Sequence, residues 1–218
     1  MKELKYILMD LDGTITDPMQ SITSSAAYAL AKFGISVEDL STLQCFIGPP
    51  LTVSFQQYFG FDEKQALDGL RYYREHYSVN GLDGNIPYDG IAELLAELKK
   101  SDKTVILATS KPIEYAEEIL RRNDLIGFFD FVSGNDLHES RPTKQQVIEY
   151  IIEQYSDISS ENTIMVGDRM YDVEGAHEYG LKCAAVLYGY GSREELEECG
   201  ADYILSDVAE LRELLLGE

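Results

Sequence analysis

The stretch YILMDLDGTITD, Tyr6–Asp17, decides the fold and much of the chemistry of this chain. Its apolar residues, Tyr6–Met9, have the length and composition of a buried strand. They are followed at once by two carboxylates, Asp10 and Asp12, and then by a Gly-Thr pair. Packing accounts for the apolar run, but it gives no reason for two acidic side chains separated by one leucine. The stretch therefore predicts a buried strand whose end carries reactive groups.

The composition limits the kinds of partner that the chain can bind. With 218 residues and 44% hydrophobic side chains, the chain can form one substantial core or a core domain with a smaller appended one. Its 39 acidic and 18 basic residues give a formal net charge of -21. That charge disfavours binding to a nucleic acid polymer or an anionic membrane. Any anionic substrate would need a local cation, from a metal ion or a lysine, to offset this charge.

The cysteines and the hydropathy predict a cytoplasmic protein. Cys45, Cys183 and Cys199 are odd in number, widely spaced and free of C-x-x-C patterns, so neither a disulfide framework nor a zinc site is indicated. No apolar run reaches 18 residues, and the run before Asp10 is too short for the core of a signal peptide. We therefore expect no export and no membrane insertion. We also expect a monomer or weak dimer.

Short apolar segments alternate with amphipathic ones along most of the chain. The predicted strands are 4–10, 103–109, 128–134, 162–168, 182–189 and 201–207. The predicted helices between and after them are 89–101, 113–123, 143–155, 170–180 and 208–218. Because strands that alternate with helices are joined by crossovers, the pattern predicts an α/β fold with a doubly wound parallel sheet, Rossmann-like in architecture.

One long segment interrupts this alternation. Residues 18–34, 50–60 and 62–78 all show helical patterns, with no strand between them. An all-helical insertion directly after the first strand indicates a separate cap domain. We therefore predict an α/β core domain formed by residues 1–16 and 86–218, and a helical cap domain formed by residues 17–85.

Polar residues follow three of the predicted strands at the point where each strand ends. They are Asp10, Thr109 with Ser110, and Asp168, which Asp172 follows one helical turn later. In an open parallel sheet, ligands bind outside the carboxyl ends of the strands. Each of these residues could instead cap a helix, because Asp, Ser and Thr are favoured at that position. That alternative is weakest for Asp10 and Asp12, since Asp17 and Pro18 already provide a helix start.

Two carboxylates at positions i and i+2 suit a nucleophile and a proton carrier. Asp10 would attack an electrophile, and Asp12 would protonate a leaving oxygen and later deprotonate a water. Gly13 allows a sharp turn that brings backbone N–H groups toward an anion, and Thr14 can satisfy a local backbone group. Because like charges this close repel, either one carboxylate stays protonated or a metal ion sits between them. Mg²⁺ fits, since it takes a few carboxylates and leaves room for a substrate phosphate.

Four motifs resemble those of the haloacid dehalogenase superfamily, in the right order and over the whole chain. They are DLDGT (Asp10–Thr14), ATSK (Ala108–Lys111), a lysine at Lys144, and GDRMYD (Gly167–Asp172). The helical insertion is similar to the type 1 cap of that superfamily. The stretches DGTITDPMQSI and FIGPPL resemble its phosphoglycolate phosphatase-like branch.

The resemblance implies a role for each matching residue. Asp10 would be the nucleophile that forms an aspartyl-phosphate, and Asp12 the general acid and base. Mg²⁺ would be held by the Asp10 side chain, the Asp12 carbonyl and Asp168, with Asp172 in support. Residues implied at the substrate phosphate are Gly13, Thr14, Thr109 and Ser110. Lys144 would neutralise the charge of Asp10 and of the phosphoryl group.

Two assignments stay open at this stage. Many relatives place a proline after the third-motif lysine, whereas here Pro142 precedes Lys144, so Arg141 is an alternative in that position. In the cap, Arg74 is the candidate for a contact to the substrate, although an arginine on a polar helix face is more commonly solvated. The GYGS stretch, Gly189–Ser192, is interpreted as a turn because it lacks the spacing of a Walker-type phosphate loop.

The predicted activity is that of a Mg²⁺-dependent phosphatase, a phosphoric monoester hydrolase acting on a small phosphorylated metabolite. Phosphoglycolate and nucleoside 5'-monophosphates both suit the branch that the chain resembles. A phosphomutase with the same motifs remains an alternative. So does a signalling switch that carries a long-lived phosphoaspartate, although such receiver domains place the acceptor on a later strand and have no helical cap.

Overall fold

The computed structural model describes residues 4–138 and 140–217. It divides into two compact units. One contains the chain up to Thr16 and again from Pro87 onward, and the other is the segment Asp17–Ile86. Two short strands, β2 (Thr16–Asp17) and β3 (Ile86–Pro87), pair with each other where the chain passes between the units.

The first unit is built on a six-stranded sheet of order β5-β4-β1-β6-β7-β8. Every neighbouring pair of strands is parallel, which confirms the predicted doubly wound α/β fold. The strands are β1 (Tyr6–Met9), β4 (Thr104–Pro112), β5 (Phe131–Asn135), β6 (Thr163–Gly167), β7 (Lys182–Val186) and β8 (Tyr203–Leu205). Each lies within or overlaps one of the six strands expected from the sequence.

The register of the central strands brings the ends of three strands into line. Met9 of β1 pairs with Leu107 of β4 on one side and with Val166 of β6 on the other. Residues that directly follow these partners therefore lie along one edge of the sheet. That edge is the carboxyl end, where crossover connections leave room for a ligand.

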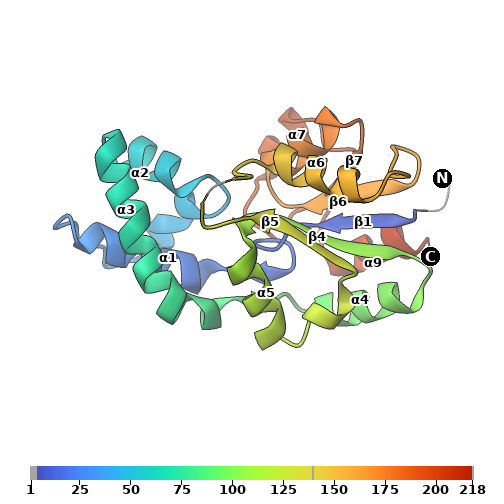
Figure 1. The fold of residues 1–218 in the computed structure, drawn as a ribbon, viewed down its shortest axis with the longest axis horizontal. Coiled ribbons are helices and arrows are strands. Elements are labelled where there is room, and N and C mark those ends of the chain that lie inside the picture. The colour runs from blue at the N-terminus through green and yellow to red at the C-terminus, as the bar shows by residue number, and fades with distance from the viewer. Residues whose placement is uncertain (1–3, 139, 218) are drawn as a thin grey trace. The chain divides into compact units, whose positions relative to one another are not determined.

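Helices cover both faces of this sheet, as Figure 1 shows. One face carries α6 (Lys144–Gln154) and α7 (Met170–Glu178), and α8 (Arg193–Glu198) packs beside α7. The opposite face carries α4 (Ile91–Lys100), α5 (Ile113–Arg122) and α9 (Val208–Leu216). A short 3₁₀ turn, Ile126–Phe128, precedes β5. The sequence analysis missed α8, a six-residue helix with four glutamates.

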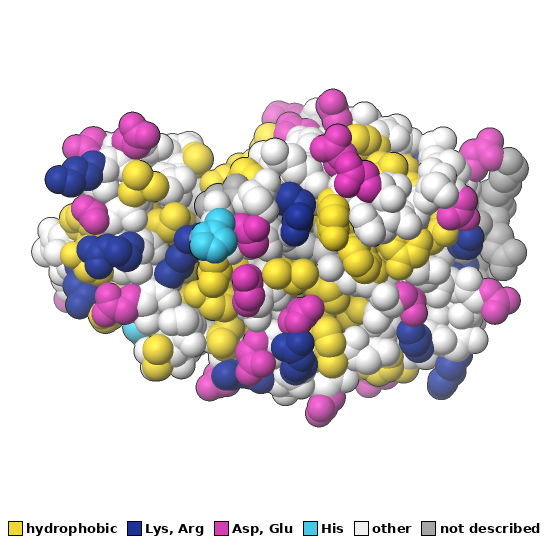
Figure 2. Space-filling model, in the orientation of Figure 1, with side chains coloured by type: hydrophobic (Ala, Val, Ile, Leu, Met, Phe, Trp, Pro, Cys, Tyr) yellow, Lys and Arg dark blue, Asp and Glu magenta, His cyan; other side chains and the backbone are white. Residues whose placement is uncertain are grey.

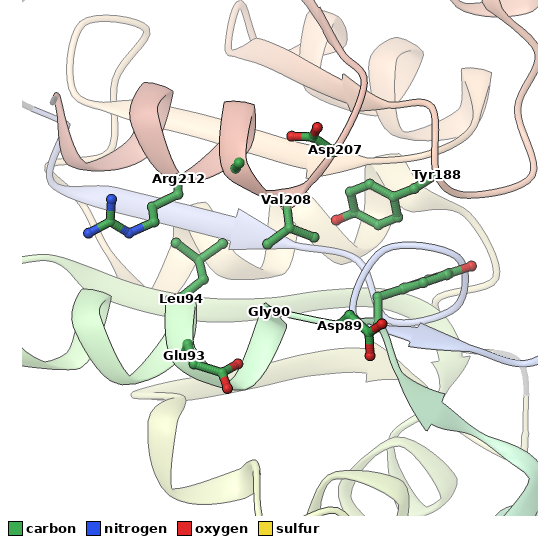
Figure 3. Close-up of a pocket in the computed structure, with 10 residues that line it drawn as sticks. Asp89, Gly90, Glu93, Leu94, Tyr188, Asp207, Val208 and Arg212 are labelled. Atoms are coloured by element: carbon green, nitrogen blue, oxygen red, sulfur yellow. The ribbon is translucent and has the colours of Figure 1, made fainter.

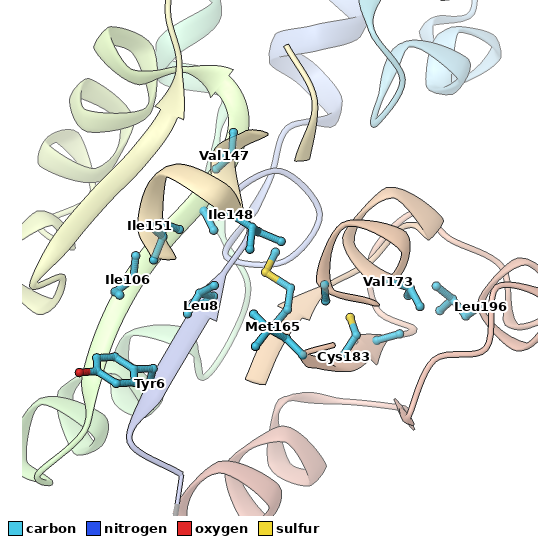
Figure 4. Packing of buried hydrophobic residues seen from close by; sticks show 14 residues of the cluster. Tyr6, Leu8, Ile106, Val147, Ile148, Ile151, Met165, Val173, Cys183 and Leu196 are labelled. Atoms are coloured by element: carbon cyan, nitrogen blue, oxygen red, sulfur yellow. The ribbon is translucent and has the colours of Figure 1, made fainter. Parts of the chain in front are cut away.

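The core beneath α6 and α7 is apolar and continuous. Leu8, Ile106 and Met165 project from three neighbouring strands and are fully buried. Val147 and Ile151 of α6 pack onto them, as Figure 4 shows. Burying a side chain of this size stabilises the fold by roughly 1.5–3 kcal/mol. This packing fixes the strands whose ends carry the candidate site.

The second unit is helical. Its α-helices are α1 (Met19–Ala31), α2 (Leu51–Phe59) and α3 (Glu63–His76). A 3₁₀ helix, Leu40–Phe46, precedes α2, and a π-helical turn, Tyr77–Gly81, and a 3₁₀ turn, Leu82–Gly84, follow α3. Its interior is aromatic: the Phe55 ring stacks on Phe61 at 5.5 Å between centroids and meets Phe46 edge-on at 4.8 Å.

Charged side chains are spread over the surface. On the face drawn in Figure 2, Lys and Arg side chains stand among Asp and Glu side chains. Among residues 4–138 and 140–217, no helix combines the length and the apolar character that crossing a membrane requires.

Candidate active site at the carboxyl end of the sheet

The turn after β1 places Asp10 and Asp12 at the sheet edge. The Asp10 N–H donates to the Val166 carbonyl at 2.9 Å, which extends the pairing of β1 by one residue. The chain then turns sharply, with Gly13 at φ +89°. A Cβ atom on Gly13 would lie 2.1 Å from Asp168 Oδ2, closer than real side chains approach. Glycine is therefore required here for both its backbone conformation and its lack of a side chain.

Lys144 reaches the candidate nucleophile from the first turn of α6. Its Nζ donates to Asp10 Oδ1 at 2.7 Å and to the Ala108 carbonyl at 2.7 Å. It also forms an ion pair with Asp172 Oδ1 at 2.8 Å. Burial of this side chain would lower its pKa, but the charges of Asp10 and Asp172 outweigh burial and raise the pKa of Lys144. The pairing therefore favours the charged ammonium form of Lys144 beside Asp10.

Arg141 lies elsewhere. Its Nε donates to the Gly134 carbonyl at 3.0 Å, and its guanidinium carbon lies 4.4 Å from the centre of the Tyr150 ring. Of the two basic residues that the sequence left open, the structure thus brings Lys144 to Asp10. The proline that precedes Lys144 does not prevent this, because Thr143 caps α6 with its own side chain.

Asp10, Asp168 and Asp172 form an acidic cluster. One carboxylate oxygen from each lies within 4.8 Å of the other two. Burial, followed by the charges of Asp172 and Asp10, raises the pKa of Asp168 well above its usual range. Burial also raises the pKa of Asp172 to about 6, although Lys144 opposes that shift.

These carboxylates fit a divalent metal ion. Asp172 Oδ1 is buried, and the ammonium group that it meets, Lys144 Nζ, is shared with Asp10 Oδ1 and the Ala108 carbonyl. Asp168 is fully buried, and its carboxylate charge meets the like charges of its neighbours. A hard cation that takes oxygen ligands would offset the repulsion between these carboxylates.

Asp12 is held by a lysine that the sequence analysis did not assign to the site. Lys111 Nζ donates to both carboxylate oxygens of Asp12, at 2.8 and 2.6 Å. Both side chains are largely buried, with 7% of Lys111 and 17% of Asp12 exposed. Burial raises the pKa of Asp12, and Lys111 opposes the rise. The sequence signal that could have indicated it is the ATSK motif, which ends at Lys111.

The remaining predicted residues lie in different places. Thr14 is buried, and its Oγ1 donates to Asp168 Oδ1 at 3.5 Å. Thr109 is buried at the same strand end, where its Oγ1 accepts from the Lys111 N–H at 3.2 Å. Ser110 follows it within β4 and is half-buried. Arg74 belongs to the other unit, in the last turn of α3, and its contact with substrate stays a prediction.

The family follows from a comparison of the whole chain with known protein families. Residues 7–186 match the model of the haloacid dehalogenase-like hydrolases. The chain belongs to this family. The resemblance inferred from the four motifs is thereby confirmed, and the matched residues include the motifs that form the sheet-edge site.

Individual relatives cover nearly the whole chain. A 5'-nucleotidase from Pseudomonas aeruginosa is 42% identical over 97% of this chain and 96% of its own length. A crystal structure of a predicted phosphatase from Clostridium acetobutylicum is 44% identical, covers both chains fully and superposes with a TM-score of 0.94. The tyrosine-protein kinase PtkA of Mycobacterium tuberculosis is 32% identical over 97% of this chain and 72% of the kinase.

Proposed function

We propose that this hydrolase is a Mg²⁺-dependent phosphatase of small phosphomonoesters that acts through a phosphoaspartate at Asp10. The observation that carries the proposal is the environment of Asp10. One of its oxygens is paired with the buried ammonium group of Lys144, and Asp168 and Asp172 complete an acidic cluster beside it. A carboxylate in such a place can act as a nucleophile toward phosphorus while its own charge is balanced.

The first step transfers the phosphoryl group to the protein. A carboxylate oxygen of Asp10 attacks phosphorus, the bond between phosphorus and the ester oxygen breaks, and Asp12 gives its proton to that departing oxygen. Asp10, Asp168, Asp172 and the Asp12 carbonyl would hold Mg²⁺. When bound there, Mg²⁺ supplies positive charge to the phosphoryl oxygens. Lys144, whose Nζ lies 2.7 Å from Asp10 Oδ1, contributes further positive charge.

The second step returns the protein to its starting state. Asp12, now a carboxylate, takes a proton from a water whose oxygen attacks phosphorus. The bond between phosphorus and Asp10 breaks, and inorganic phosphate leaves. Lys111 orients the Asp12 carboxylate through two hydrogen bonds, so the general acid and base is held in one position. Hydroxyl and backbone groups of Thr109 and Ser110 are our candidates for binding the phosphoryl oxygens.

Nucleoside 5'-monophosphates are the substrates that we place first. The support is the Pseudomonas aeruginosa 5'-nucleotidase, which is 42% identical over nearly the whole of both chains. Phosphoglycolate remains the second candidate, from the motifs discussed above. Arg74 in the helical unit is our candidate for a contact to the part of the substrate that is not transferred. We place the protein in the cytoplasm.

The test is phosphate release from a panel of phosphomonoesters, with and without EDTA. The panel holds nucleoside 5'-monophosphates, phosphoglycolate, a sugar phosphate, O-phosphotyrosine and p-nitrophenyl phosphate. Phosphotyrosine is included because of the PtkA relative. We expect Mg²⁺-dependent release, fastest from a nucleotide, that Asp10→Asn lowers by roughly four orders of magnitude or more.

A matched control is Asp102→Asn, which makes the same change at an exposed aspartate in the turn before β4. It should leave the rate and the unfolding temperature unchanged. Retention of steady-state turnover by Asp10→Asn would refute the phosphoaspartate route. Wild-type activity that EDTA does not reduce would refute the metal requirement. Transfer of the phosphoryl group to a sugar instead of water would identify a mutase.

A further inference from the structure

The loop after β7 contacts the candidate metal site directly. The Tyr190 N–H donates to Asp168 Oδ2 at 2.8 Å. The Tyr188 hydroxyl donates to the Thr14 carbonyl at 3.0 Å. One short segment, Tyr188–Gly191, therefore contacts both the aspartate that ends β6 and the turn that follows β1. The sequence alone identified only a turn in this region.

Two glycines allow the loop to come this close. A Cβ atom on Gly189 would lie 2.3 Å from Asp168 Cβ and 2.4 Å from the Gly13 carbonyl oxygen. A Cβ atom on Gly191 would lie 2.0 Å from the Asp168 carbonyl oxygen. Any side chain at either position would push the backbone away from Asp168. The close approach of the loop to Asp168 therefore requires glycine at both positions.

The loop holds the Asp168 carboxylate from two directions. Oδ2 accepts from the Tyr190 N–H, while Oδ1 faces the Thr14 hydroxyl at 3.5 Å. The Thr14 peptide is in turn fixed by the Tyr188 hydroxyl. Both carboxylate oxygens are therefore oriented by groups that the same loop anchors. The contacts join residues up to 174 positions apart in sequence.

The Tyr188 ring is not enclosed on every side. It lines an open pocket of about 630 Å³ between the starts of α4 and α9, together with Leu94 and Val208, as Figure 3 shows. The Tyr88 ring meets it edge-on, with 4.9 Å between centroids. Among the described residues, no packing holds the ring on its pocket side, so the hydrogen bond from its hydroxyl to Thr14 helps to fix the position of the ring. Burial raises the pKa of Tyr188, which keeps the hydroxyl protonated and able to donate.

We propose that Tyr188 is a positioning residue for the metal site, acting with the backbone of Gly189–Gly191 to orient Asp168 for the ion. This inference rests on the proposed function, since it assigns Asp168 to the metal. Partners that orient metal ligands typically contribute 10–100-fold to metal affinity or activity. The Tyr188 hydroxyl bonds to the Thr14 carbonyl, which is not among the proposed metal ligands, so its effect should fall on metal affinity more than on turnover at saturating metal.

The test measures Mn²⁺ binding directly, by the electron paramagnetic resonance signal of the free ion. Tyr188→Phe keeps the ring and removes the hydroxyl. We expect its dissociation constant for Mn²⁺ to rise roughly tenfold. Its kcat at saturating Mg²⁺ should stay within about threefold of the wild type, while the Mg²⁺ concentration for half-maximal rate rises with the dissociation constant. Tyr179→Phe, a hydroxyl deletion at the far end of α7, should bind Mn²⁺ like the wild type.

The outcomes separate this inference from the function on which it rests. A dissociation constant for Tyr188→Phe within twofold of the wild type would overturn the positioning role and leave the phosphatase proposal intact. A wild type that binds no Mn²⁺ would remove the metal site and with it both proposals. If Tyr188→Phe fails to fold, Gly189→Ala tests the contribution of the loop backbone by the same criterion, because its added methyl group meets Asp168 and Gly13.

Discussion

The two units bury polar side chains of different kinds. In the helical unit the buried polar groups are neutral and mostly bonded to nearby backbone. Ser21 donates to the Pro18 carbonyl, Ser25 to the Ser21 carbonyl, and Asn85 to the carbonyls of Gly81 and Leu82. In the α/β unit the buried groups include the ionisable side chains of Lys144, Asp168 and Asp172.

The partners of the buried charges lie far away in sequence. Lys144 pairs with Asp10 across 134 positions, and Thr14 with Asp168 across 154. A neutral hydroxyl bonded to nearby backbone adds roughly 1 kcal/mol to stability. A buried charge must overcome the cost of leaving water, and replacing such a pair with apolar groups is often neutral or stabilising. The comparison teaches that the helical unit uses buried polar groups for its own structure, whereas the buried ionisable groups at the sheet edge are those to which we assign the chemistry.

Among the variants that test this comparison of the two units, removal of Lys144 should have the largest effect. Lys144→Met leaves Asp10 and Asp172 buried without their cation. In metal-free protein near neutral pH we expect a loss of roughly 3–5 kcal/mol in the free energy of unfolding. Turnover should fall by about 10²–10³-fold. Urea denaturation and steady-state kinetics measure the two effects.

The matched control is Lys99→Met, which breaks an exposed ion pair with Asp130. Because exposed pairs contribute about 1 kcal/mol or less, this variant should remain close to the wild type. Equal losses for the two variants would contradict the distinction between a buried functional charge and a surface one.

Replacement of Lys111 should alter the pH profile. Lys111 lowers the pKa of Asp12 against the effect of burial, so Lys111→Gln should raise that pKa. The first step needs protonated Asp12, and the descending limb of kcat/KM should therefore move to higher pH. Loss of orientation should also lower kcat/KM by roughly tenfold at neutral pH. The measurement is the pH dependence of kcat/KM between pH 5 and 9. A descending limb at the same pH in Lys111→Gln and the wild type would show that Lys111 does not set the pKa of Asp12.

The stabilisation by Mg²⁺ should depend on pH. The folded state raises the pKa of Asp168, and that of Asp172 to about 6 from 3.8, so it binds protons more tightly than the unfolded chain does. In metal-free protein the contribution of Asp172 is complete below about pH 4 and is lost as the pH rises through 6. Mg²⁺ needs the ionised carboxylates. The rise in unfolding temperature on adding Mg²⁺ should be larger at pH 7.5 than at pH 5, and equal rises would contradict the assignment.

A hydroxyl of the helical unit should give the smallest effect. Ser25 donates to the Ser21 carbonyl at 2.8 Å and lies 3.0 Å from His76 Nδ1. Ser25→Ala should cost about 1 kcal/mol in unfolding free energy. Hydrolysis of p-nitrophenyl phosphate by the folded variant should stay within about twofold of the wild type. A large loss of activity at unchanged stability would place this hydroxyl in the chemistry.

Much of the α/β unit could be predicted because its signals are local. Short apolar runs gave the strands, and their register places Asp10 and Asp168 at one edge. Lys144 could be narrowed to one of two basic residues, but the choice depended on a contact with Asp10 that no local pattern encodes.

The parts that could not be predicted depend on contacts between distant segments. Lys111 was missed because β4 continues to Pro112, three residues beyond the expected end, and carries the side chain to Asp12. The Tyr188–Gly191 loop has the composition of an ordinary turn. Its role depends on two close approaches, to Asp168 and to Gly13, that only the folded chain reveals.

The most direct measurement of the central claim is chemical trapping of the phosphoaspartate. The enzyme is mixed with its best substrate and Mg²⁺, quenched in acid within milliseconds and reduced with borohydride, which converts an acyl-phosphate to an alcohol. Mass spectrometry of the peptide Tyr6–Asp17 should find this conversion at Asp10, dependent on substrate and Mg²⁺. Turnover without conversion at Asp10, or conversion at Asp12 instead, would contradict the account.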